Sequence, residues 1–76
     1  MKTVYVIIEQ PPSVKPEYTV RKWLIDARGN WVLTDDVSSA STLRIARGYI
    51  PDGFARHDRT DKDDPGVLEW WEGGIA

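Results

Sequence analysis

The sequence contains no cysteine, and it has only one methionine, one phenylalanine and one histidine in 76 residues. The absence of cysteine excludes disulfide bridges, thiolate metal sites and a cysteine nucleophile. The longest apolar run, Val4 to Ile8, is far too short to cross a bilayer. No basic and then apolar leader precedes this run. We therefore expect a cytoplasmic chain with no membrane partner.

Aromatic side chains supply the bulk that other small domains take from disulfides. Four tryptophans and three tyrosines stand beside ordinary shares of hydrophobic (41%) and charged (29%) residues. A chain of this length has room for one core. We therefore predict a single compact domain over residues 1–76.

The first 34 residues read as three strands. Thr3 to Ile8 is β-branched and aromatic on both faces, which is typical of a central strand. A proline-rich loop leads to a second strand, Tyr18 to Ile25, with an expected bulge near Arg21 and Lys22. The turn at residues 26–29 ends in a glycine, and Trp31 to Thr34 returns as the third strand of a hairpin.

Between Asp35 and Ile50 the apolar residues recur at spacings of three and four, which predicts one helix. Ser38 or Ser39 would cap this helix, and Gly48 and Pro51 would end it. Two further strands follow, Phe54 to Arg59 and Val67 to Glu72, and the last four residues are expected to fray. The predicted fold class is α+β, with an antiparallel sheet of about five strands and one helix on a face, in the order βββαββ.

Negative charge is concentrated near the C-terminus. Residues 1–50 carry seven Lys and Arg against five Asp and Glu, whereas residues 51–76 carry three against seven. Such an acidic end can attract a basic partner. We therefore predict partner-binding residues in this region: Asp58, Asp61, Asp63, Asp64, Glu69, Trp71 and Glu72.

The run from Asp61 to Glu72 is similar in spacing to an EF-hand calcium loop. Pro65 removes a required side-chain oxygen, and Gly73 and Gly74 leave no exit helix, so we predict neither a metal site nor a cofactor. His57 is the only histidine, and its neighbour Asp58 is expected on the opposite strand face. No catalytic residue is therefore predicted, and the chain is expected not to be an enzyme.

Adjacent Trp70 and Trp71 should leave opposite faces of their strand, so that one enters the core and the other can contact a partner. Bases and aromatics also alternate on the first hairpin, a mixture that can bind single-stranded nucleic acid by phosphate pairing and base stacking. The residues of this alternative site are Arg21, Lys22, Trp23, Arg28 and Trp31.

In its size, acidity, lack of motifs and sheet-plus-helix organisation, the chain resembles the small phage-encoded anti-CRISPR proteins, and the resemblance implies that the Asp58 to Glu72 region is the natural contact. This resemblance implies an inhibitor that docks on a Cascade-type CRISPR surveillance complex in the host cytoplasm and blocks DNA binding. Carboxylates can occupy the positions where such a complex binds phosphates, because Arg and Lys pair with both groups.

Overall fold

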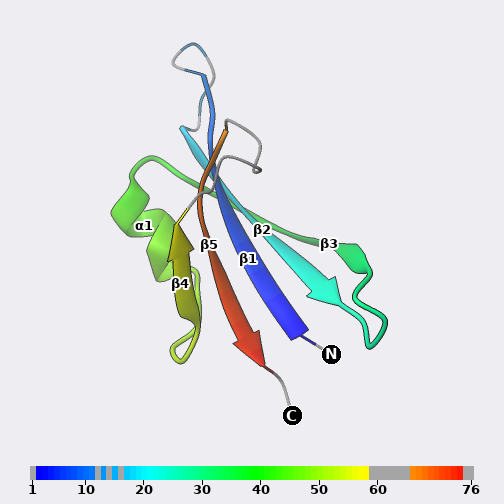
Figure 1. The fold of residues 1–76 in the computed structure, drawn as a ribbon. Helices are drawn as coiled ribbons and strands as arrows, with labels where there is room; N and C mark the ends of the chain where they lie inside the picture. The colour runs from blue at the N-terminus through cyan, green and yellow to red at the C-terminus, as the bar shows by residue number, and fades with distance from the viewer. Residues whose placement is uncertain (1, 12, 14, 16, 59–65, 75–76) are drawn as a thin grey trace.

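The fold is an antiparallel sheet of five strands with one short helix, in the chain order βββαββ that the sequence predicts. The computed structural model describes residues 2–11, 13, 15, 17–58 and 66–74 (Figure 1). Across the sheet the strand order is β3-β2-β1-β5-β4. The elements are β1 (Lys2–Glu9), β2 (Tyr18–Ile25), β3 (Trp31–Ala40), α1 (Leu43–Gly48), β4 (Ala55–Asp58) and β5 (Val67–Gly74).

β1 lies at the centre of the sheet, as its unbroken apolar sequence predicts. It pairs with β2 over its whole length and with β5 on its other side. Val4 and Ile7 point to opposite faces of the sheet, because their sequence separation is odd, and both are fully buried. Both faces of β1 are therefore shielded from solvent.

The β2–β3 hairpin forms at the predicted turn. Gly29 has a φ of +85°, and the carboxylate of Asp26 accepts hydrogen bonds from the backbone N–H groups of Arg28 and Asn30, both at 2.9 Å. These bonds stabilise the charged carboxylate, with the Asn30 N–H as the largest contribution, and hold the pKa of Asp26 below its ordinary value. The turn is thus held by its own side chain, and Figure 1 shows it projecting away from α1.

β3 is longer than the sequence predicts, and the helix is shorter. The predicted helix over Asp35 to Ile50 is wrong in its first half, because Asp35 to Ala40 continues β3 and Val37 to Ala40 pairs with β2. The helix covers only Leu43–Gly48, and its N-cap is Thr42, whose hydroxyl accepts a hydrogen bond from the Ile45 N–H at 3.1 Å. Pairing with β2 stabilises the strand conformation of this segment more than its helical apolar spacing favours a helix.

The predicted bulge lies on β3 and not on β2. β2 pairs with β1 without a register shift. Between β2 and β3, Arg21 pairs with Val37 and Trp23 pairs with Leu33, so the extra residues lie on β3. Thr34 closes this irregularity by donating a hydrogen bond from its hydroxyl to the carbonyl of Lys22 at 2.8 Å. Trp23 therefore stays on the face opposite to Val20.

The main core lies between the sheet and α1. Its buried members are Ile7, Val20, Ala40 and Ala46, with Leu43, Ile50, Leu68 and Trp71 packed against them. Ala40 contributes to this core from β3, whereas Ala46 contributes to it from α1. α1 contacts β2 and β3 and leaves the other face of the sheet without a helix. Within the described ranges, no helix is long and apolar enough to span a membrane.

The prediction that the last four residues fray is wrong for Gly73 and Gly74. Both belong to β5 and pair with Thr3 and Lys2. Gly73 is buried beneath the ring of Phe54, whose nearest carbons lie 2.7 Å from the position that a Cβ would occupy. Close approach of an aromatic ring therefore requires glycine here.

Candidate functional site

The acidic residues of the predicted partner-binding region that the structure describes are engaged within the chain. Asp58 accepts from Arg56 at 3.1 Å. Glu72 pairs with Lys2 at 2.8 Å and lies 3.8 Å from the imidazole of His57. The contact with Lys2 is the largest cause of a lowered pKa of Glu72. These carboxylates are neutralised by neighbouring bases, which weakens any field they present to a partner.

Glu69 is buried and is not a surface group, and its role in partner binding stays a prediction. The residue is 2% exposed, and its carboxylate accepts two hydrogen bonds from Arg47, at 3.1 and 2.7 Å, and one from the Trp71 indole at 2.6 Å. Burial alone raises the pKa of Glu69, but the hydrogen bonds from Arg47 and Trp71 outweigh it, so the pKa lies below its ordinary value. The group connects α1 to the sheet.

The two adjacent tryptophans leave opposite faces of β5, as predicted. Trp71 pairs with Tyr5 and is the tryptophan that packs, partly buried, against the main core, and its role in partner binding stays a prediction. Trp70 pairs with Val6 on the opposite face. There its ring stacks on the imidazole of His57, with the centroids 4.0 Å apart and the planes at 11°.

The remaining predicted acidic contacts, Asp61, Asp63 and Asp64, lie outside the described residues, as does the part of the calcium-loop-like run over residues 61–65. Over the ranges that are described, no three His, Asp or Glu side chains gather in a way that could hold a metal ion. The contact role of the three aspartates stays a prediction.

Several exposed apolar side chains lie together on the sheet face that α1 does not cover. Trp31, Leu33 and Val37 of β3 are 51%, 48% and 43% exposed. Their partners on β2 are Ile25, Trp23 and Arg21, which place all three on the same face as Val4 and Val6. Trp23 meets Trp31 edge to face, with ring centroids 6.0 Å apart. We call the set Trp23, Trp31, Leu33 and Val37 the uncovered patch.

The sheet separates the residues of the predicted nucleic-acid site. Arg21, Trp23 and Trp31 share the face of the uncovered patch. Lys22 points to the other face, because it pairs with Tyr5, which packs against the main core. Arg28 is exposed in the hairpin turn. Of the three basic residues predicted for this site, only Arg21 therefore lies on the same strand face as Trp23 and Trp31.

The acidic pair Asp35 and Asp36 lies in the β3 irregularity, between Leu33 and Val37, and both residues are exposed. Among the residues that the structure places, no Lys or Arg lies within ion-pair distance of either carboxylate. Both residues fall within the segment predicted as helix, so the sequence does not identify them as exposed charges beside an apolar strand. The apolar residues Trp31 and Leu33 alternate along the strand, and this sequence pattern could have indicated that one face of β3 is apolar.

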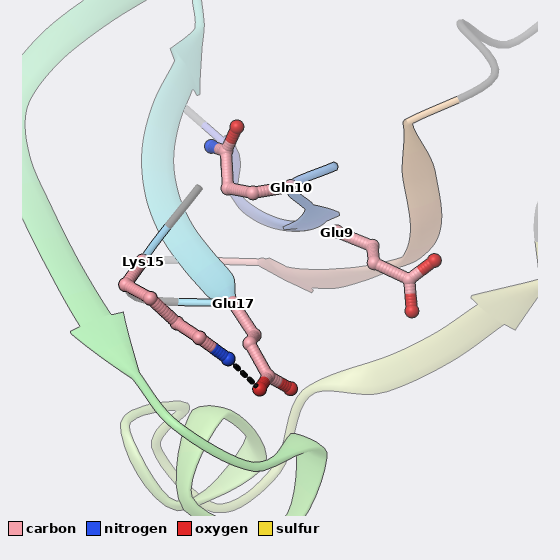
Figure 2. A pocket seen from close by; sticks show the side chains of 4 residues that line it. All are labelled: Glu9, Gln10, Lys15 and Glu17. Carbon is pink, nitrogen blue, oxygen red and sulfur yellow. Dashed lines mark hydrogen bonds and ion pairs between the residues drawn. The ribbon is translucent and has the colours of Figure 1, made fainter. Parts of the chain in front are cut away.

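A small polar pocket lies at the start of β2 and the end of β1, lined by Glu9, Gln10, Lys15 and Glu17 (Figure 2). Lys15 pairs with Glu17 in solvent, and the Gln10 side chain donates to the Thr19 hydroxyl at 3.2 Å. The exposed pair of Lys15 and Glu17 is typical of a solvated loop.

Comparison of the chain with protein-family models, with curated proteins and with solved structures finds no significant match. The candidate site therefore depends on the geometry of this chain alone, and the uncovered patch is its most exposed apolar feature.

Proposed function

We propose that this protein is a non-enzymatic protein-binding module, and that the uncovered patch is its contact surface. The observation that carries the proposal is the half-exposure of Trp31, Leu33 and Val37 side by side on one face. Monomeric proteins seldom leave contiguous apolar side chains in water, and such patches mark interaction sites. Tryptophan is also enriched among the residues that dominate binding energy.

The composition of the patch favours a protein over a nucleic acid. Leu33 and Val37 offer aliphatic surface, which packs against apolar side chains and gives little to base stacking. Arg21 is the one base that pairs across strands with a patch residue. The exposed carboxylates of Asp35 and Asp36 lie on the same strand and repel phosphates. A partner with an apolar centre and basic groups at its rim matches this arrangement.

The specific partner that the anti-CRISPR resemblance implies is a Cascade-type surveillance complex. Such a complex binds DNA through basic surfaces, so it offers the rim chemistry that the exposed carboxylates of Asp35 and Asp36 would match. Inhibition would be stoichiometric, because the proposal assigns the chain no catalytic step.

The test is a DNA-binding assay with a purified Cascade-type complex and labelled target DNA. Excess wild-type protein should abolish the shifted band, and the Trp31→Ser, Leu33→Ser double variant should lose at least about tenfold in inhibitory potency. Ile45→Ser is the matched control, since Ile45 is also about half exposed but lies on α1, away from the patch. Unchanged DNA binding in the presence of excess wild-type protein contradicts the inhibitor proposal.

Single-stranded nucleic acid is the second candidate, because Arg21, Trp23 and Trp31 share one face. This candidate predicts binding to a labelled oligonucleotide that weakens with salt and is lost in the Arg21→Glu variant. Lys22→Glu should have little effect on that face, since Lys22 points to the other one. Equal loss in both variants contradicts a site built on the uncovered patch.

A further inference from the structure

The edge strand β3 is exposed on both faces near the hairpin turn. Val32 is 48% exposed, although it points to the face that carries α1 farther along the strand, and its neighbours Trp31 and Leu33 are similarly exposed on the opposite face. Packing of a partner onto one face would leave Val32 in water. A strand added at the edge places new neighbours on both faces at once.

Among the strands that the structure describes, β3 pairs only with β2 and lies at the edge of the sheet, so its backbone has no described strand on its outer side. At the far end of the strand the Tyr49 hydroxyl donates to the Ser39 carbonyl at 3.1 Å and so occupies the edge there. The irregularity between Leu33 and Val37 interrupts regular pairing in the middle. The part of the edge that remains for ladder formation is Trp31 to Leu33.

The charges on either side of this apolar segment have opposite signs. Arg28 precedes it in the turn, and Asp35 and Asp36 follow it in the irregularity. Across the described part of the chain, no carboxylate lies within ion-pair distance of Arg28. Along the chain a basic residue is followed by the apolar segment and then by two acidic residues. A second copy that runs antiparallel presents these groups in the reverse order, so that acidic residues face basic ones.

We propose that two copies of this protein associate through antiparallel pairing of Trp31–Val32–Leu33, so that the two sheets join into one. With Val32 opposite Val32 of the second copy, each Trp31 lies opposite a Leu33. By the same count, Asp36 falls opposite Arg28 and Asp35 opposite Gly29. Arg28 is a turn residue, so its long side chain supplies the reach toward both carboxylates. The twofold axis forms each charge pair twice.

This arrangement has a structural consequence for the uncovered patch. Residues directly opposite in an antiparallel ladder point to the same face, so the two uncovered faces lie on one side of the joined sheet. The dimer therefore places two copies of the patch side by side. The inference itself does not depend on the proposed function, because it uses only the edge of β3 and its flanking charges.

Charge swaps test the register directly. We expect wild-type protein to shift from monomer to dimer at concentrations on the order of tens of micromolar in sedimentation equilibrium, since a short edge contact is small. Arg28→Glu alone, and Asp35→Lys with Asp36→Lys, should each raise the dissociation constant about tenfold by placing like charges opposite one another. Mixing the two variants should restore dimers, because the heterodimer is complementary at both ends. Asp52→Lys, in an exposed turn away from β3, is the matched control.

Crosslinking provides a second readout in this cysteine-free chain. Val32→Cys should form a disulfide-linked dimer under mild oxidation, because opposite residues of a ladder have the Cα separation that a disulfide needs. Ile45→Cys, equally exposed on α1, should remain monomeric. A wild-type chain that stays monomeric up to about 1 mM, or variants that do not recover on mixing, overturns the proposal.

Discussion

The guanidinium of Arg47 on α1 holds the carboxylate of Glu69 on β5 through two hydrogen bonds, at 3.1 and 2.7 Å. Arg56 of β4 approaches the same carboxylate at 3.6 Å, and the Trp71 indole donates to it at 2.6 Å. One buried acid thus joins the helix, the edge strand and the core. The carboxylate lies in the interior, whereas the Arg47 side chain is 38% exposed.

Removal of the arginine should therefore cost more than removal of the acid. Arg47→Met leaves a buried carboxylate without its main partner, and we expect the free energy of unfolding to fall by about 3 kcal/mol. Glu69→Leu frees an arginine that can turn toward solvent, and the loss should be smaller. Urea denaturation followed by tryptophan fluorescence measures both. The opposite order would contradict the assignment of Glu69 as the desolvated member of the pair.

The same carboxylate predicts acid sensitivity. Because the pKa of Glu69 is lower in the folded protein than its ordinary value of 4.5, its ionisation stabilises the fold above that value, and the gain is lost as pH falls through the lowered pKa. Asp26 and Glu72 also have lowered pKa values, so the wild type loses stability from several groups. We expect the difference in unfolding free energy between wild type and Glu69→Leu to shrink on acidification below pH 4.5. A difference that stays constant in that range would rule out this linkage.

Addition of a single methyl group at Gly73 should strongly reduce the stability of the fold. A Cβ at this position would lie 2.7 Å from the Phe54 ring, so Gly73→Ala forces the ring or strand β5 to move, and we expect a loss of about 1–3 kcal/mol. Gly48→Ala is the control, because a Cβ there meets nothing within 4 Å and Gly48 has no positive φ. Alanine at that position should be neutral or stabilising by about 0.5 kcal/mol. Thermal melts of the two variants give the comparison.

Substitution of Thr3 should increase the free energy of unfolding. Its hydroxyl is buried and has no hydrogen-bond partner among the residues that are placed. Thr3→Val keeps the shape and removes the unpaired group, so we expect a gain of about 1 kcal/mol. Thr19→Val is the control. The Thr19 hydroxyl accepts a hydrogen bond from the Gln10 side chain, so its removal should not increase stability. Chemical denaturation distinguishes the two outcomes.

Much of the fold could be read from local sequence. The unbroken apolar run of residues 3–8 predicts the central strand, and the turn with Gly29 predicts the hairpin, because each depends on neighbours in the chain. The opposite orientation of Trp70 and Trp71 follows from strand geometry alone.

Local sequence also misled where pairing partners decide the outcome. Residues 35–40 have a helical spacing, yet they form strand because β2 offers a ladder beside them. Glu69 looks like one more acid in an acidic region, and nothing in its neighbours shows that Arg47, 22 residues earlier, holds it inside the protein.

The sequence by itself determined the number of strands, their antiparallel order along the chain and the single core, because periodicity and turn chemistry act over a few residues. The tertiary structure alone decided which side chains remain in water. Burial of Glu69 and partial burial of Trp71 depend on the short helix that lies across one face of the sheet, whereas Trp31 and Leu33 are exposed on the other face. That placement arises from contacts between segments distant in the chain, and no local pattern encodes it.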